Sequence, residues 1–428
     1  MQLPKEVKKY LSKQNFGNWY LEIGKTKYFH NIVVIPALNE FENIPQLLNS
    51  ISKNSTKYLK ETLIIFVVNN SENEKTEVVE NNFKSIEFIR QKITDNESNL
   101  NIGLINASTK GKAFSVKNGG VGSARKLGMD LALNYFNYSS NQKKLLISLD
   151  ADCLVKEDYL EEITYKFNSE NLHATVVSFE HILPENLDQK KAIINYEIFL
   201  RHYILGLKYA KSHYDYISVG STIICNAESY VKVGGMNKKK GGEDFYFLEK
   251  LAKLGKISKI TNTKVYPSSR ISDRVPFGTG PRIKRFLENK QNEYETYSNE
   301  IFDILKKWLE IFNSELFFND WEIKTKEIHP ELFKFLISQN FNNDWLNILK
   351  NSKSKGQIIK QKLNWMDSFR TLKLVHHLRD SAFPNENMFT SLNLLLDKLE
   401  IQKNYDTTEE IPSLEIQLKY LELLRRLT

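Results

Sequence analysis

Residues 145–152 read LLISLDAD, an apolar run that ends on two aspartates separated by one small residue. Similar runs rich in Val, Ile and Leu occur at 32–35, 63–68, 174–179 and 217–225. Because these runs lack strict polar alternation, they are typical of strands buried on both faces of a parallel sheet. Helical patterns lie between them. The sequence therefore predicts an open α/β sheet over roughly the first 280 residues, with ligands at the carboxyl ends of the strands.

The sequence changes character after about residue 285. Strand-like runs disappear, and helical patterns follow at 301–312, 330–337, 344–349, 357–379 and 388–399. A length of 428 residues also exceeds what one hydrophobic core usually serves. We therefore predict an α/β domain at 1–285 and a smaller all-α domain at 286–428. Within the first domain, a helix predicted at 192–210 is expected to pack its apolar stripe on the sheet.

The composition is that of a globular protein. Hydrophobic residues make up 41% and charged residues 26%, which excludes a mostly disordered or collagen-like chain. The net charge of +8 is uneven: 41 basic against 30 acidic side chains give +11 over residues 1–285, whereas 19 against 22 give −3 over residues 286–428. We expect an anionic ligand to bind in the first part. No basic-aromatic module of a nucleic-acid-binding protein is recognisable, so we expect no nucleic-acid partner.

The two cysteines, Cys153 and Cys225, are too few for a disulfide framework or a four-ligand zinc site. The N-terminal residues carry charge without an apolar segment behind them, and the longest apolar runs are far shorter than the ~20 residues of a membrane span. We predict a cytoplasmic protein, with peripheral contact at the inner face of the membrane as an open alternative.

Asp150 and Asp152 are candidate ligands of a divalent cation. Carboxylates at the tip of a strand can reach a hard cation, which takes oxygen ligands and keeps positions open for phosphate. The alternative is a strand-end aspartate that caps the following helix, and an isolated Asp-x-Asp sequence is common.

Two further segments combine small and polar residues at expected ends of strands or helices. Residues 31–40 read NIVVIPALNE, in which the chain is expected to leave the sheet at the proline and to begin the next helix at Glu40. Residues 119–128 read GGVGSARKLG, where small residues let a ligand approach and Arg125 offers a fork suited to phosphate. The alternative for Arg125 is an ion pair with a carboxylate of the sheet.

A fourth segment, residues 234–248, reads GGMNKKKGGEDFYFL. Glu243 and Asp244 follow a glycine pair and begin a predicted helix. One interpretation is a mobile loop that presents a general base. The other is a pair of acids stabilised by the dipole of the helix.

Taken together and in this order, the four segments resemble the family 2 glycosyltransferases, which have the GT-A fold, a Rossmann-like, mostly parallel sheet with flanking helices. The resemblance covers roughly residues 28–265. It implies an enzyme that moves a sugar from a nucleoside-diphosphate sugar to an acceptor hydroxyl, with a Mn²⁺ or Mg²⁺ ion and inversion at the anomeric carbon. The implied roles are metal and donor binding for Asp150 and Asp152, nucleotide contact for Pro36, Ala37 and Glu40, donor contact for Arg125, and the catalytic base for Asp244 with Glu243 as its neighbour.

The sequence departs from this family after the second predicted strand. Residues 67–72 read VVNNSE, where the family usually has an Asp-rich turn that binds the base. Asn69 can still accept from an imide N–H through its carbonyl, but less strongly than a carboxylate. The sequence therefore indicates a uracil base in the donor less strongly than is usual for this family, and donors with guanine or thymine are alternatives.

Residues 268–285, SSRISDRVPFGTGPRIKR, mix turn-forming residues with arginines that include Arg270 and Arg274. We interpret this segment as a lid that closes on the donor diphosphate or on a phosphorylated acceptor. An interdomain linker with solvated charge is the alternative.

Two alternatives to an inverting transferase stay open on sequence alone. One is a retaining GT-A transferase that acts on a small phosphorylated acid. The other is a catalytically silent relative that serves as a binding or scaffold protein. A glycan, a lipid precursor and a small metabolite all remain candidate acceptors, and the oligomeric state is open.

Overall fold

The computed structural model describes residues 2–24, 27–95, 99–272, 278–314, 320–403, 405 and 409–428. The chain divides into two compact units. The first, here called the sheet unit, comprises Met1–Ile182 and Ser218–Gly278. The second, here called the helical unit, comprises Leu183–Ile217 and Thr279–Thr428.

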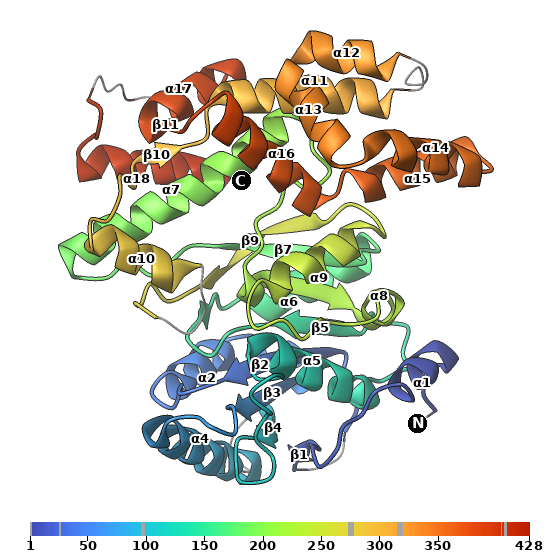
Figure 1. Cartoon of the computed structure of the whole chain (residues 1–428). Helices are drawn as coiled ribbons and strands as arrows, with labels where there is room; N and C mark the ends of the chain where they lie inside the picture. Colours follow the sequence, from blue (N-terminus) through green and yellow to red (C-terminus); the bar gives the residue numbers. More distant parts are fainter. Residues whose placement is uncertain are drawn as a thin grey trace. The chain divides into compact units, whose positions relative to one another are not determined.

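The sheet unit is built on a nine-stranded sheet of order β1-β4-β3-β2-β5-β8-β7-β9-β6 (Figure 1). At its centre β2 (Asn31–Ala37), β3 (Thr62–Asn69), β4 (Asn101–Ala107) and β5 (Leu145–Ser148) are parallel, and Val33 pairs with both Ile64 and Ile147. Every residue of β2, β3 and β5 is buried. This burial on both faces explains the continuous apolar runs and confirms the α/β fold class.

The remaining strands make the sheet mixed. β8 (Ile223–Asn226) runs antiparallel to β5 and to β7 (Ala174–Phe179), and β9 (Ser258–Tyr266) runs parallel to β7. The short strands β1 (Glu22–Ile23) and β6 (Leu154–Val155) pair antiparallel with β4 and β9. The predicted run at 217–225 is shorter as a strand because residues Gly220–Thr222 form a 3₁₀ turn, η2.

Helices cover the sheet at close range. Gly128 on α5 (Val121–Ala132) shows this best, since a Cβ there would lie 2.4 Å from Val34 Cγ1 and 2.8 Å from Val67 Cγ2. The other helical segments of this unit are α1 (Lys5–Leu11), α2 (Ile44–Ser52), α3 (Thr56–Lys60), α4 (Thr76–Thr94), η1 (Leu133–Tyr135), α6 (Tyr159–Ser169), α8 (Ala227–Lys232) and α9 (Glu243–Ala252).

The helical unit contains α7 (Leu187–Tyr209), α10 (Thr279–Leu287), α11 (Asn299–Asn313), α12 (Trp321–Ile328), α13 (Pro330–Ser338), α14 (Phe341–Asn351), α15 (Lys355–Trp365), α16 (Ser368–Ser381), α17 (Met388–Lys398) and α18 (Leu414–Leu427). It also holds a small antiparallel ladder between β10 (Glu295–Thr296) and β11 (Glu386–Asn387), which the sequence did not predict.

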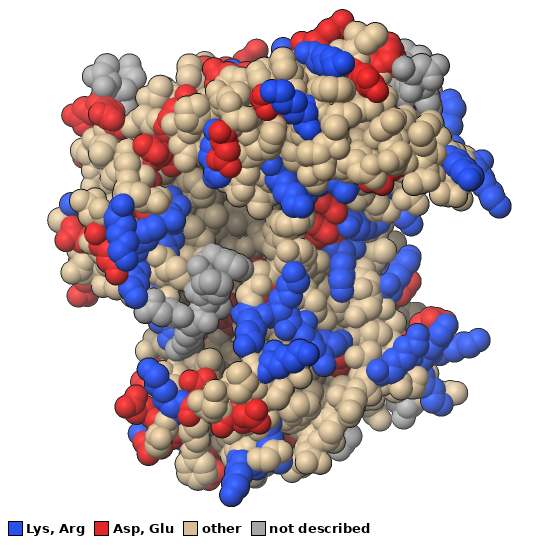
Figure 2. Space-filling view, viewed as in Figure 1, with Lys and Arg blue, Asp and Glu red and all other residues tan. Residues whose placement is uncertain are grey.

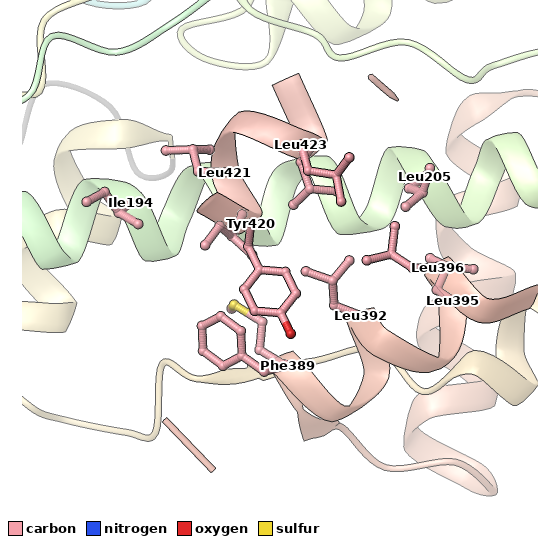
Figure 3. Packing of buried hydrophobic residues seen from close by; sticks show 12 residues of the cluster. Ile194, Leu205, Phe389, Leu392, Leu395, Leu396, Tyr420, Leu421 and Leu423 are labelled. Carbon is pink, nitrogen blue, oxygen red and sulfur yellow. The ribbon is translucent and has the colours of Figure 1, made fainter. Parts of the chain in front are cut away.

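The helix predicted at 192–210 exists as α7, but its expected packing on the sheet differs from the structure. Its residues Ile194 and Leu205 share a buried core with Leu392 on α17 and Leu421 on α18 (Figure 3). Segments 183–217 and 279–285, expected within the 1–285 domain, therefore belong to the compact helical unit. An apolar stripe shows that a helix face is buried, but not which element covers it.

Two further features bear on the sequence predictions. Among the residues that the structure describes, no helix is both long and apolar enough to cross a lipid bilayer. Cys153 and Cys225 are both buried and form no disulfide.

Candidate functional site

The candidate site lies where parallel strands of the sheet unit end. Because β2 and β5 are parallel neighbours, with Val34 opposite Ser148, the residues that follow them emerge at the same edge. Pro36 and Ala37 are the last residues of β2 and are buried within the sheet. Glu40, also buried, follows them and accepts a hydrogen bond of 2.6 Å from Asn43 Nδ2.

Asp150 and Asp152 follow β5 and keep part of their carboxylates exposed, at 32% and 22% of the side chain. With Cys153 they form a group whose ligand atoms lie within 4.8 Å of one another. Burial and the two adjacent carboxylates raise the pKa of Cys153 well above its ordinary value. The chemistry of the donor set thus fits a hard divalent cation held by the two carboxylates, with the remaining positions left to water or phosphate.

Arg125 joins this pair of aspartates to the acids of α9. Its Nη2 donates to Asp150 Oδ1 and its Nη1 donates to Glu243 Oε1, while the side chain is almost fully buried. Burial alone would lower the pKa of Arg125, but the carboxylates of Asp150, Glu243 and Asp244 outweigh it and raise that pKa. The ion pair with a sheet-edge carboxylate, left open by the sequence, is therefore present.

The space for this guanidinium depends on Gly220, which sequence reasoning did not single out. A Cβ at Gly220 would lie 2.4 Å from Arg125 Nη2 and 2.7 Å from its Cζ. Nothing in the sequence around Gly220 signals this role, because the contact links η2 to α5.

Glu243 and Asp244 begin α9 after Gly242, whose φ of 71° is left-handed. Glu243 is buried and Asp244 partly buried. Burial raises the pKa of Glu243 to about 7, with Arg125 opposing and Asp244 adding to the rise. Burial likewise raises the pKa of Asp244 against the effect of Arg125. One guanidinium faces three carboxylates here, so surplus negative charge is held in a poorly solvated place and favours proton uptake.

Two glycine-rich motifs interlock to place these acids. A Cβ at Gly122, in the first turn of α5, would lie 2.3 Å from Lys239 O and 3.0 Å from Asn237 O. Asn237 Nδ2 in turn donates to the carbonyl of Glu243 at 3.0 Å. The small residues expected to admit a ligand therefore admit another backbone segment. Figure 2 shows Lys and Arg side chains gathered on the surface around α5 and α9.

Arg270, which follows β9, contacts the other side of the aspartate pair. Its Nη2 lies 2.9 Å from Asp152 Oδ2 and also pairs with Glu40 Oε1. Burial would lower the pKa of Arg270, but Glu40, Asp152 and Asp150 raise it overall. Arg274, the other predicted donor contact in this segment, lies outside the described residues.

Asn69 is buried at the end of β3, within a group of polar residues that depends on Asn82 of α4. Asn82 Nδ2 shares its two hydrogens among three acceptors within hydrogen-bonding distance: Asn69 O at 3.1 Å, Asn70 Oδ1 at 3.0 Å and Ser108 Oγ at 3.2 Å. Asn82 Oδ1 accepts from the N–H of Asn39, whose φ of 57° is left-handed. Sequence reasoning missed Asn82, since only tertiary packing brings α4 to these strand ends, and it missed Ser108, since that residue follows β4, which was not predicted.

No protein-family model and no curated protein sequence matches this chain. Several solved structures align with it. Residues 1–349 of S. aureus TarS are 13% identical at a TM-score of 0.38, over 80% of this chain and 91% of that chain. Their complex with UDP-GlcNAc gives 13% identity and a TM-score of 0.41, over 89% and 95%. The mannosyltransferase PcManGT from Pyrobaculum calidifontis, in complex with GDP-Man and Mn²⁺, is 13% identical at a TM-score of 0.34, over 98% and 91%. Because these TM-scores are below 0.5, the fold assignment rests on the strand order, and any function rests on this chain's own residues.

Proposed function

We propose that this protein is a metal-dependent glycosyltransferase that uses a nucleoside-diphosphate sugar. The observation that carries the proposal is the bridge made by Arg125, which links Asp150 of the Asp-x-Asp segment to Glu243, the neighbour of Asp244. Donor-binding and proton-accepting groups thereby form one cluster at the carboxyl ends of the strands, where open α/β sheets bind their ligands.

Asp150 and Asp152 would hold the divalent cation, Mn²⁺ or Mg²⁺. When bound, this cation supplies positive charge next to the diphosphate that leaves. Arg125 acts here as a positioning residue, because both terminal nitrogens of its guanidinium are engaged with Asp150 and Glu243. We assign Arg270 and Arg274 to the phosphates of the donor.

Asp244 is the proposed general base. It takes the proton from the acceptor hydroxyl as that oxygen forms a bond to the anomeric carbon, and the bond from this carbon to the diphosphate oxygen breaks. The raised pKa of Asp244 suits this step, because a base works best when its pKa is near the working pH. A single displacement inverts the anomeric centre, which NMR of the product measures directly.

Pro36, Ala37, Glu40 and Asn69 are proposed to line the nucleotide. Because an asparagine stands where a carboxylate would bind an imide more strongly, we leave the base open between uracil, guanine and thymine. The acceptor is a hydroxyl compound. A screen of nucleotide sugars by thermal shift identifies the donor, since a ligand that binds the folded state raises the melting temperature.

The test separates donor binding from turnover. Calorimetry with UDP and GDP, with and without Mn²⁺, should show metal-dependent binding to the wild type. Asp244→Asn should bind the nucleotide as the wild type does but release nucleoside diphosphate from the sugar nucleotide ~10²–10⁴-fold more slowly, with water as acceptor.

Glu249→Gln is the matched control, because Glu249 lies on the same helix and pairs with Lys253. It should leave both measurements unchanged. Absence of nucleotide binding under all conditions would contradict the proposed function and favour a scaffold role. A near-normal kcat for Asp244→Asn would contradict only the assignment of the base.

A further inference from the structure

Each carboxylate of the Asp-x-Asp segment is paired with an arginine, and the two arginines differ in freedom. Arg125 lies on α5 with its side chain only 4% exposed. Arg270 lies beyond the end of β9, outside any helix or strand, and its side chain is 32% exposed. The guanidinium group of Arg270 can therefore change partners with a smaller loss of free energy than that of Arg125.

Glu40 gives Arg270 a fixed anchor. The Glu40 side chain is only 6% exposed, and it pairs with Arg270 Nη2 while Asn43 Nδ2 donates to its other oxygen, Oε2. Removing the cation from a buried carboxylate is strongly unfavourable, so the Arg270–Glu40 pair should persist. Asp152, with 22% of its side chain exposed, is the partner that solvent or a second cation can replace.

A divalent cation and Arg270 compete for Asp152. Arg270 Nη2 lies 2.9 Å from Asp152 Oδ2, so it occupies one of the two oxygens through which Asp152 can bind a cation. Two cations cannot both take the same lone pairs at contact distance without repulsion. A metal that binds Asp152 through Oδ2 therefore requires Arg270 to release that oxygen.

We propose that Arg270 is an exchangeable counter-ion of the metal site. Without ligands it neutralises Asp152. When the metal takes Asp152, Arg270 stays anchored on Glu40 and turns its remaining donors to a phosphate of the nucleotide, for which its planar fork is suited. The phosphate half of this exchange rests on the proposed function, whereas the metal half rests on the proposed cation site at Asp150 and Asp152 and on the contacts of Arg270.

The experiment is calorimetry of the full chain, first with MnCl₂ alone and then with UDP or GDP at saturating Mn²⁺. Arg270→Gln should bind Mn²⁺ about tenfold more tightly than the wild type, because Asp152 loses one cation that competes with the metal, yet bind the nucleotide about tenfold more weakly. Arg270→Lys, which keeps the charge, should restore the metal affinity toward that of the wild type and the nucleotide affinity only in part.

Arg90→Gln is the control, since Arg90 pairs with Glu22 elsewhere in the sheet unit. It should change neither affinity. The increase in Mn²⁺ affinity should also survive ~1 M salt, where the Debye length of about 3 Å removes long-range repulsion but not competition at contact.

Unchanged or weaker Mn²⁺ binding by Arg270→Gln would overturn the inference, even if the wild type binds nucleotide as proposed. An effect that disappears at high salt would overturn it too, since a general field would then explain the difference. Failure of the wild type to bind any nucleotide would refute the proposed function and, with it, the phosphate half of the exchange, while the metal titration would still decide the other half.

Discussion

Arg125 is the residue on which the charge balance of the site depends. Its guanidinium is buried and faces Asp150, Glu243 and Asp244, so a single positive charge serves three carboxylates. Burial raises the pKa of Glu243, and Asp244 and Asp150 add to this rise against Arg125, whereas the three carboxylates raise the pKa of Arg125 against its burial. The arginine is held in its charged form by its neighbours, while the second and third carboxylates lack an equal partner.

Glu243 should therefore make folding stability depend on pH. Its pKa of about 7 in the folded state exceeds the ordinary 4.5, so the folded state binds this proton more tightly than the unfolded state does. The stabilisation that the proton gives is complete below about pH 4.5 and is lost as the pH rises through 7. The free energy of unfolding of the wild type minus that of Glu243→Gln should decrease between pH 5 and 8, on the order of 1–3 kcal/mol. Urea denaturation measures this difference, and Glu157→Gln, which removes an exposed carboxylate, is the control. A difference that stays constant or grows with pH would contradict the raised pKa.

At the scale of elements, the site depends on how closely the loop before α9 packs on α5. Gly122 belongs to a helix, and its φ is not left-handed, so alanine is acceptable to the local backbone. The obstacle is tertiary, because the added Cβ would meet Lys239 O at 2.3 Å and Glu243 Cβ at 3.0 Å. The loop and the acids after it would have to shift.

We expect Gly122→Ala to lower the free energy of unfolding by about 1–3 kcal/mol and to reduce kcat. Gly356→Ala is the matched control, since Gly356 is also helical and its added Cβ would meet nothing within 4 Å. There alanine should stabilise the protein by less than the ~0.5–1 kcal/mol of a helix interior, because Gly356 lies in the first turn of α15. Melting curves and turnover rates compare the two variants. Stabilisation by both would show that α5 and the loop are not in tight contact.

At the scale of the whole molecule, α7 belongs to the helical unit through polar as well as apolar contacts. His202 is fully buried, and burial lowers its pKa to about 3, so its ring is neutral. Ser391 Oγ donates to Tyr297 O and therefore accepts from His202 Nε2, at 3.1 Å. The other nitrogen, Nδ1, then accepts from Thr296 Oγ1 at 3.0 Å. These bonds join α7 to β10 and α17.

Leu392→Ala should accordingly loosen α7 together with α17 and α18. Leu392 is fully buried, and its truncation should cost about 2–5 kcal/mol in unfolding free energy. Native-state hydrogen exchange should show faster exchange of α7 amides, while β2, β3 and β5 stay protected. Leu146→Ala, in the centre of β5, should give the opposite pattern. Unchanged protection of α7 in Leu392→Ala would contradict its place in the helical unit.

The sequence by itself determined several of the central elements and the chemistry near them, although it did not reveal β4 or β9. Continuous apolar runs such as 145–149 predicted buried parallel strands, because full burial on two faces removes the polar alternation. Since parallel strands end at one edge, the residues after them lie close together: Asp152 and Glu40 both pair with Arg270, and Asp150 lies beside Asp152.

Only the tertiary structure decided the partners of those elements. Apolar periodicity shows that one face of a helix is buried, but α7 could cover a sheet or other helices with the same pattern, and it packs in the helical unit. Gly220 and Asn82 act through contacts with residues far away in sequence, and no local pattern encodes such contacts. Arg125 illustrates both what the sequence predicts and what only the folded structure decides. Its charge and place on α5 were readable, but its burial between Asp150 and Glu243 depended on three segments meeting in the folded chain.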